Sequence, residues 1–154
     1  MRRFGVARVT EVLSRPQRPL PVIDEATAPF WAAARQGMLA ILRCERCRRW
    51  RNPPSPVCPD CWSEEAEWEP VSGLGTVSHF TVLRQPRVRG FEAAVPYAVV
   101  VVELDEQAGL LFVSNLVEAD PDTVRIGMRV QLRFEPLEGG LRLPQFAPVR
   151  NGGR

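Results

Sequence analysis

The four cysteines of this chain form two closely spaced pairs. They occur as Cys44-Glu-Arg-Cys47 and Cys58-Pro-Asp-Cys61, with ten residues between the pairs, and the sequence holds no other cysteine. Each Cys-x-x-Cys turn points two thiolates at one place, so the two turns together suit a tetrahedral Zn²⁺ ion. Two disulfides or a redox Cys-x-x-Cys are the alternatives, and the paired spacing favours zinc over both. Four thiolates leave no open position, which predicts a structural site.

The inventory of reactive side chains is small. All 20 basic residues are arginine, so Schiff-base chemistry on lysine is excluded. The one histidine is His79, and the cysteines are already assigned to the metal, which leaves almost no pairing of nucleophile and base. We therefore expect no catalysis by this chain on its own.

Charge and hydropathy limit which cellular compartments and which partners are compatible with this sequence. The longest uncharged apolar stretch, residues 95–102, is far too short to span a membrane, and Arg8 and Glu11 interrupt any export signal near the start. These features predict a cytoplasmic protein. A net charge of +2 does not by itself indicate a nucleic-acid partner.

The chain divides into four predicted segments. Residues 1–21 end in a proline- and arginine-rich run that is typical of an extended arm. Residues 22–70 hold a short helix, predicted over 27–36 with Thr27 as its cap and Gly37 as its stop, and then the zinc ribbon over about 39–69. Residues 71–149 form a second domain, and residues 150–154 form a tail.

The second domain shows the period of β-strands. Strands are predicted over residues 76–83, 96–104, 110–116, 128–135 and 141–146. Between the third and fourth strands, Asp120 caps one helical turn that begins at Pro121 and ends at Gly127. Five strands with a short helix after the third match a closed Greek-key barrel of the OB type. The predicted fold is therefore mostly β.

Several side chains have both a functional and a structural interpretation. Phe30 and Trp31 either anchor a partner or pack on the chain's own core. His79, placed on one strand face with Val77 and Thr81, either reaches a partner's active site or is a histidine satisfied by a hydrogen bond. The hydroxyl of Tyr97, the sole tyrosine, meets either a partner or the barrel backbone.

Arginines also gather around the cysteine pairs. Arg46, Arg48, Arg49 and Arg51 flank Trp50, a combination that is able to grip phosphates and stack on a base. Nearby carboxylates, which include Glu45 and the acidic residues of 60–69, cancel this field, so a solvated loop is the other interpretation.

The order of these motifs resembles a known family. The motifs are Phe30-Trp31, Gly37-x-Leu39, the two cysteine pairs with Pro53-Pro54 between them, Gly73-Leu-Gly75-Thr-Val, Pro96-Tyr97, Glu103-Leu-Asp-Glu106, Ile126-Gly-Met128-x-Val130 and Pro144-x-Phe146-x-Pro148. Together they resemble the zinc-ribbon/OB-fold family of acyl-CoA-associated proteins, formerly a domain of unknown function, over residues 22–149. The resemblance implies a rubredoxin-like zinc ribbon followed by a five-stranded OB barrel.

The resemblance also implies a function. Members of the family look like accessory subunits of thiolase-fold enzymes, namely thiolases, synthases or retro-aldolases, in which the partner carries the chemistry. This chain is then expected to form a hetero-oligomer and to help build its partner's acyl-CoA site. Coenzyme A carries phosphates that arginine forks recognise, so Arg84, Arg87 and Arg89 are the predicted contacts. Phe30, Trp31, Tyr97 and His79 join them as residues that face coenzyme A or the partner.

Two other functions compete with this one. OB barrels and zinc ribbons also bind single-stranded nucleic acid, through basic grooves with exposed aromatic residues. The most arginine-bearing strand, residues 128–135, has no outward aromatic side chain, which argues against that module. A stand-alone CoA-thioester hydrolase or hydratase would need an acid/base pair, and no spacing here singles one out.

Overall fold

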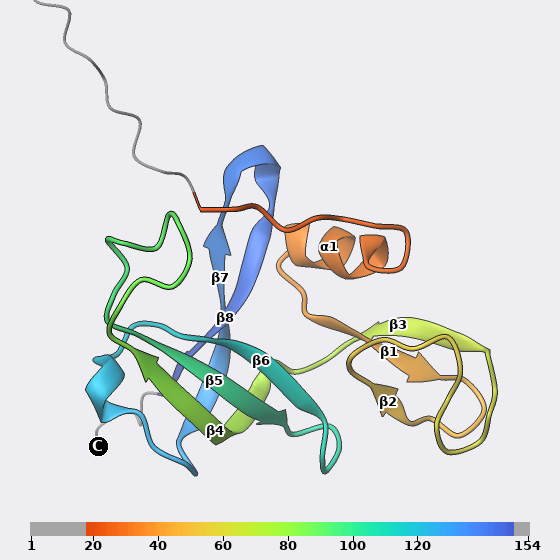
Figure 1. The fold of residues 1–154 in the computed structure, drawn as a ribbon. Coiled ribbons are helices and arrows are strands. Elements are labelled where there is room, and N and C mark those ends of the chain that lie inside the picture. Colours follow the sequence, from red (N-terminus) through yellow and green to blue (C-terminus); the bar gives the residue numbers. More distant parts are fainter. Residues whose placement is uncertain (1–17, 150–154) are drawn as a thin grey trace, which may run out of the picture.

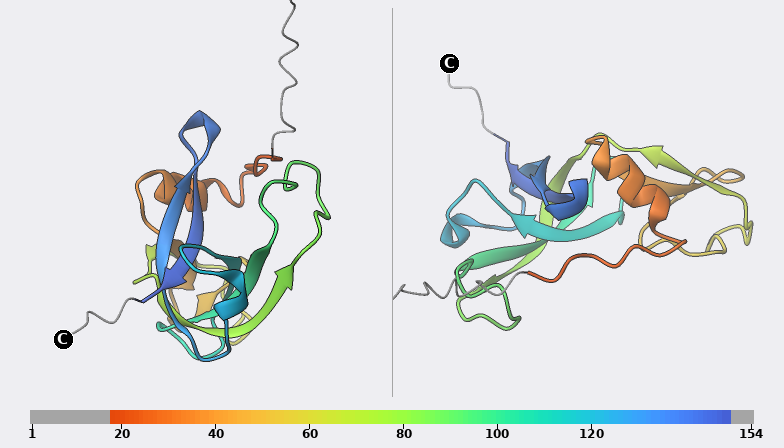
Figure 2. Two further views of the ribbon diagram at one scale, coloured as in Figure 1. Left: turned by 90° about the vertical axis from the view of Figure 1, so that its left-hand side faces the viewer. Right: turned by 90° about the horizontal axis from the view of Figure 1, so that it is seen from above.

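Two β structures follow one another along the chain, a three-stranded sheet and a closed barrel (Figure 1). The computed structural model describes residues 18–149, so the predicted arm is described only from Arg18 onward, and the predicted tail lies outside the described residues. The first sheet has the strand order β2-β1-β3, and the barrel has the order β4-β5-β6-β8-β7. The barrel and the sheet lie next to one another, and α1 lies above the sheet and beside the β7–β8 hairpin, as the views of Figures 1 and 2 show.

The barrel confirms the predicted OB-type architecture. Its strands are β4 (Leu74–Leu83), β5 (Tyr97–Leu104), β6 (Leu111–Leu116), β7 (Arg129–Pro136) and β8 (Arg142–Pro148), and each lies within two residues of its predicted bounds. All strand pairs are antiparallel except β6 with β8, which meet in parallel at Leu116 and Phe146. The zinc ribbon consists of β1 (Ala40–Cys44), β2 (Trp50–Arg51) and β3 (Ala66–Pro70).

The helix α1 (Ala28–Arg35) ends as predicted but begins differently. Gly37, with a φ of 80°, donates its N–H to Ala34 at 2.9 Å, and Met38 donates to Ala33 at 3.0 Å, which together make a Schellman motif. Thr27 occupies the predicted cap position, but its side chain makes no capping hydrogen bond. Its hydroxyl donates instead to Asp24 Oδ1 at 2.6 Å. The Thr27 side chain therefore stabilises the turn before the helix and accepts no hydrogen bond from the N–H groups of the first helical turn.

The single helical turn after β6 is shorter than predicted. Asp120 caps η1 (Pro121–Thr123) as expected, because its carboxylate accepts the N–H of Asp122 at 2.9 Å. The turn does not continue to Gly127, since Val124 is already extended. Gly127, with a φ of 83°, instead turns the chain into β7. A second such turn, η2 (Glu138–Gly140), joins β7 to β8.

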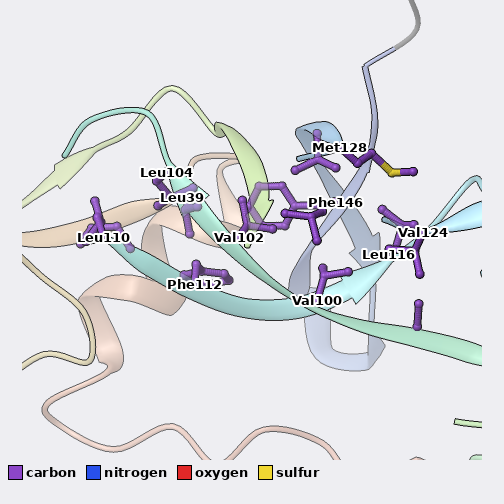
Figure 3. Packing of buried hydrophobic residues seen from close by; sticks show 14 of the residues in the cluster. Leu39, Val100, Val102, Leu104, Leu110, Phe112, Leu116, Val124, Met128 and Phe146 are labelled. Atoms are coloured by element: carbon purple, nitrogen blue, oxygen red, sulfur yellow. The ribbon is translucent and has the colours of Figure 1, made fainter. Parts of the chain in front are cut away.

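One hydrophobic core runs through both units. In the barrel, Val77, Val100, Val102, Val130 and Phe146 are all fully buried in this core. Figure 3 shows Val100 and Val102 beside Phe146. The same cluster continues into the zinc ribbon through Leu39, Ile41 and Trp50. The ribbon is therefore packed onto the barrel by apolar contact and does not hang from a linker.

A β-bulge in β4 changes which of its side chains face outward. Val77 pairs with Val102, whereas the next paired residue is His79, which pairs with Val101, so Ser78 is an extra residue in the strand. Directly paired residues share a sheet face, and Val102 is buried while Val101 faces outward. The prediction that Val77 and His79 share one face is therefore wrong. His79 lies on the outer face.

Candidate metal centre and partner-facing surface

The four cysteine sulfurs converge on one point. Cys44 Sγ lies 3.6 Å from Cys61 Sγ, Cys47 Sγ lies 3.5 Å from Cys58 Sγ, and all four atoms lie within 4.8 Å of one another. None of them is in a disulfide. Zn–S bonds of about 2.3 Å in a tetrahedron place sulfurs about 3.8 Å apart, so this set fits a zinc ion or a metal of similar size.

Each cysteine pair is held by the same backbone turn. Arg48 donates its N–H to the Cys44 carbonyl at 3.0 Å, and Trp62 donates to the Cys58 carbonyl at 3.0 Å. Both donors have a positive φ, 63° for Arg48 and 60° for Trp62. The two turns are thus copies of one geometry, and each needs a left-handed residue directly after its second cysteine.

Backbone N–H groups in these turns also favour the thiolate form of the ligands. The N–H of Cys47 lowers the pKa of Cys44 to about 6. The N–H of Cys61 lowers the pKa of Cys58 in the same way. Because a thiolate is the form that binds metal, the turns prepare both of these buried sulfurs for coordination.

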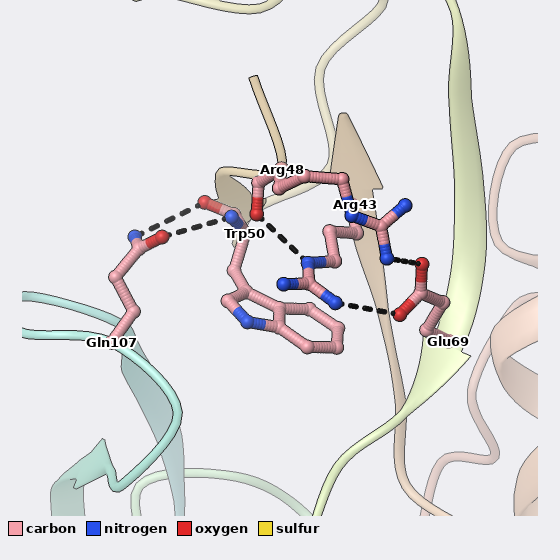
Figure 4. A network of polar contacts seen from close by, with 5 residues as sticks. All are labelled: Arg43, Arg48, Trp50, Glu69 and Gln107. Carbon is pink, nitrogen blue, oxygen red and sulfur yellow. Dashed lines mark hydrogen bonds and ion pairs between the residues drawn. The ribbon is translucent and has the colours of Figure 1, made fainter. Parts of the chain in front are cut away.

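The arginines near the cysteine pairs are largely engaged within the chain (Figure 4). Arg43 lies over the ring of Trp50, 4.6 Å from its centroid, and forms an ion pair with Glu69 at 2.9 Å. Arg48 pairs with the other oxygen of Glu69 at 2.6 Å. These hydrogen bonds, first that of Arg43 and then that of Arg48, lower the pKa of Glu69.

This arrangement argues against the interpretation of these residues as a phosphate grip, although Arg46 is exposed and has no ion pair within residues 18–149. Trp50 and Arg51 are buried, with 9% and 4% of their surface exposed, so neither is available to a base or a phosphate. Arg49 is paired with Asp60 at 3.0 Å. The interpretation of these residues as part of the chain's own structure is therefore the one that the geometry supports.

A pair of hydrogen bonds joins the ribbon to the barrel (Figure 4). Gln107, in the turn between β5 and β6, accepts the N–H of Trp50 at 2.9 Å and donates to the Trp50 carbonyl at 3.4 Å. Asn52 adds a bond to the Leu111 carbonyl at 2.6 Å. The sequence analysis missed Gln107, since an exposed-looking glutamine in a turn carries no signal of its own.

Two adjoining cavities lie along the seam between β6 and β8. The first, of about 310 Å³, is lined by Phe30, Trp31 and the outward valines of β5 and β6. The second, of about 230 Å³, is lined by Tyr97 and Phe91, and Asn115 borders both cavities. Phe30 also packs on Phe112 of the core, with centroids 6.3 Å apart, which confirms its predicted packing on the chain's own core. Its role toward a partner stays a prediction.

The loop after β4 borders the second cavity. Phe91 of this loop lies 5.7 Å from the Tyr97 ring, measured between centroids. Arg84 is held in an ion pair with Asp122. Arg87 and Arg89 are exposed and form no ion pair with any residue in the described range 18–149. The structure thus brings Tyr97 and the arginine loop together.

His79 is not part of this group. Its Nδ1 atom lies 3.2 Å from the hydroxyl of the adjacent Ser78, and its ring is exposed on the outer face of β4. Its cross-strand neighbour there is Val101 of β5, which in turn pairs with Val113 of β6. His79 therefore lies in an apolar row on the outside of the barrel.

Within residues 18–149, α1 is too short to cross a membrane, and the structure holds no longer helix there.

Family models match both units of the chain. Residues 31–67 match the rubredoxin-like zinc ribbon domain of ChsH2, and residues 68–135 match the C-terminal OB-fold domain of ChsH2. The chain belongs to this family of zinc-ribbon/OB-fold proteins, which is also known as DUF35.

Curated relatives of this chain include a subunit of an acyl-CoA enzyme and scaffold proteins. A probable enoyl-CoA hydratase alpha subunit from Thermomonospora curvata is 39% identical over 96% of this chain and 46% of its own length. A DUF35 domain-containing scaffold protein from Methanocaldococcus jannaschii is 30% identical over 75% of this chain and 81% of its own. This chain spans about half the length of the first curated relatives that it matches.

A solved structure shares the same architecture. The chain superimposes on one chain of the Ltp2-ChsH2(DUF35) aldolase with a TM-score of 0.75 and 38% identity. The match covers 84% of this chain and 98% of the other. The resemblance inferred from the sequence motifs is thereby confirmed.

The ion pairs of Glu69 generate a pH-dependent prediction. Because the folded-state pKa of Glu69 is lowered, its contribution to stability is complete above the usual glutamate pKa of about 4.3 and is lost as the pH falls below it. We expect Glu69→Gln to lower the melting temperature by roughly 2–4 °C at pH 7 and by less at pH 3. The measurement is calorimetry at both pH values. Glu67→Gln, on the same strand without an ion pair in the described residues, is the control, and equal effects of the two changes at pH 7 would contradict the prediction.

Proposed function

We propose that this chain is a non-catalytic scaffold subunit that binds a thiolase-fold enzyme and helps to form that enzyme's acyl-CoA site. In this arrangement residues 22–70 are the zinc-bound unit and residues 71–149 are the docking domain. The aldolase complex of the solved relative supports the proposal, as do the hydratase-subunit and scaffold names of the other relatives. Family likeness alone does not assign a role, so the case rests on the surface of the barrel.

The observation that carries the proposal is an apolar face on the outside of the barrel. We name it the valine face, and it consists of His79, Thr81, Val99, Val101 and Val113. An antiparallel strand with one solvated face normally alternates apolar and polar residues. Strand β5 has valines on both faces, which is the pattern of a strand that is covered on both sides. Val113 at its centre is 66% exposed, and a partner surface would cover it.

The seam cavities and the loop beside them fit a contact with coenzyme A. Arg87 and Arg89 belong to the loop whose Phe91 lines the second cavity with Tyr97, and they form no ion pair within residues 18–149. Guanidinium groups bind phosphates through two hydrogen bonds at once. Arg84 keeps its ion pair with Asp122 and holds the loop at its base. The neighbouring cavity, with Phe30 and Trp31 in its wall, offers apolar surface for an acyl group.

The metal of the ribbon is proposed to be Zn²⁺ with a structural role. Four sulfurs at tetrahedral spacing leave no position for water or substrate. Cys44 and Cys58 are fully buried, so the ion would lie between the ribbon's turns and fix their relative position. The ribbon then supplies a rigid support for Trp50 and, through Gln107, for the β5–β6 turn.

The docking role is tested with Val113→Arg. A charge at this exposed position should leave the fold intact and raise the dissociation constant of the partner complex at least tenfold, because the arginine must be desolvated in an apolar contact. The partner is the thiolase-fold chain that copurifies with the untagged protein from its own cells, identified by native mass spectrometry. Ile126→Arg, at a position that is 67% exposed but outside the valine face, is the control. Unchanged affinity in the Val113 variant, or the absence of any thiolase-fold chain, would refute the proposal.

The coenzyme A contact is tested with the double variant Arg87→Ala and Arg89→Ala. Loss of two phosphate contacts should weaken coenzyme A binding by the assembled complex about tenfold or more, without weakening assembly. Isothermal titration of the complex with coenzyme A measures this. Arg133→Ala removes an arginine on β7 that is paired with Glu118, and it serves as the control. Equal affinities for the double variant and the wild type would exclude the loop as the phosphate site.

The metal is tested with Cys58→Ser. We expect this variant to lose most of its bound zinc and to lose partner affinity as well, since structural zinc contributes directly to folding. Elemental analysis of the purified chain gives the metal content, and circular dichroism gives the thermal stability. Ser63→Ala, beside the same turn, should keep about one zinc per chain. A Cys58→Ser protein that retains both metal and partner would show that the site has another role.

A further inference from the structure

Trp62 is the least expected side chain on the surface of the ribbon. It follows Cys61 in the second turn, and 80% of its surface is exposed. Its backbone has a φ of 60°, a conformation that is uncommon for residues other than glycine and is an outlier for a bulky one. The chain therefore accepts backbone strain at a position where the indole gains no burial.

The first cysteine turn shows what such a residue does when its side chain serves the fold. Arg48 occupies the equivalent position, with a φ of 63°. Its guanidinium pairs with Glu69 at 2.6 Å, and its carbonyl accepts a hydrogen bond from Arg43 at 2.8 Å. The indole of Trp62 has no ring contact, cation contact or hydrogen bond with any described residue. A strained residue with no internal role indicates a role outside the chain.

We propose that Trp62 is the anchor of a second contact with the thiolase-fold partner, in which the indole enters an apolar pocket that has a basic rim. This inference rests on the proposed function, and it assigns the partner-binding role to the ribbon as well as to the valine face. Tryptophan is enriched among the residues that dominate binding energy at interfaces. The metal-bound turn holds its backbone in place beforehand, so binding costs little conformational entropy.

The charges around Trp62 define the chemistry of the pocket. The segment that follows it bears Glu64, Glu65 and Glu67, which are exposed and form no ion pair within residues 18–149. This segment holds no basic residue from position 59 to position 70. Arginines of the first turn neutralise Asp60 and Glu69, so the uncompensated charges are those of these three glutamates. Three uncompensated carboxylates repel a nucleic acid or the phosphates of coenzyme A, and they attract a protein surface that carries arginine or lysine. The occupant is therefore a protein pocket and not a nucleotide.

The decisive experiment uses two variants, Trp62→Gly and Trp62→Ala. Glycine adopts a positive φ without strain, so Trp62→Gly should keep its zinc and melt at the same temperature as the wild type or higher. Both variants should raise the dissociation constant of the partner complex at least tenfold, because both remove the indole. A fall in melting temperature for Trp62→Gly would show that the indole serves the fold, and unchanged affinity would show that it serves no contact; either result overturns the inference.

A second measurement does not depend on the folding of a variant. Oxidative labelling followed by peptide mass spectrometry should modify Trp62 in the free wild-type chain and protect it in the purified complex. Trp50, which is buried in the free chain, is the internal control. Equal labelling of Trp62 in both states would overturn the inference.

The basic rim that we propose for the partner's pocket is tested separately with a variant of this chain in which Glu64, Glu65 and Glu67 are all changed to Gln. The association rate should fall, and its dependence on salt should become weaker, because charges at the edge of a contact act mainly on the encounter. An unchanged salt dependence would overturn the assignment of a basic rim. If a thiolase-fold complex forms and Trp62 proves irrelevant, only this inference fails; if no such complex forms, the proposed function fails with it.

Discussion

The rest of the ribbon depends on four sulfur atoms held within 4.8 Å of one another. Four thiolates at this distance repel each other strongly unless a cation lies between them. With a metal in place, both cysteine turns are fixed, and so are the two left-handed residues, Arg48 and Trp62. Arg48 then holds Glu69, Glu69 holds Arg43, and Arg43 covers Trp50, whose backbone bonds to Gln107 of the barrel. A metal at one end of the molecule is thus connected to the β5–β6 turn through residues in direct contact.

Much of the fold was predictable because its signals are local. The spacing of the cysteines needs only two turns and one ion, and the barrel strands follow from runs of alternating or valine-rich residues. The stop at Gly37 and the cap by Asp120 are also local, since each concerns backbone groups within five residues. The metal-binding part of the candidate site was predictable for the same reason.

The misses concern competition between partners, which a linear pattern does not resolve. Thr27 bonds to Asp24 and not to the helix. Trp50 is buried under Arg43 and within the core cluster that it shares with the barrel. Arg84 resembles Arg87 and Arg89 in sequence, yet only Arg84 meets Asp122, which comes from the turn after β6. The exposure of Trp62 was not predictable either, because a tryptophan beside a cysteine is as readily buried as exposed. Local competition for a hydrogen bond decides the case of Thr27, and tertiary packing decides the others.

The bulge at Ser78 limits how the length of β4 can vary among proteins with this fold. Beyond it, every side chain of β4 faces the side opposite to the one that a regular strand would give, and this places His79 next to Val101 on the outside. Removing the extra residue, Ser78, would abolish the bulge but keep Val77 opposite Val102 and His79 opposite Val101. Removing a residue between His79 and Leu83 would instead turn the side chains beyond the deletion to the other face of the sheet. The outward position of Thr81 on the valine face therefore depends on the number of residues between the bulge and the end of β4.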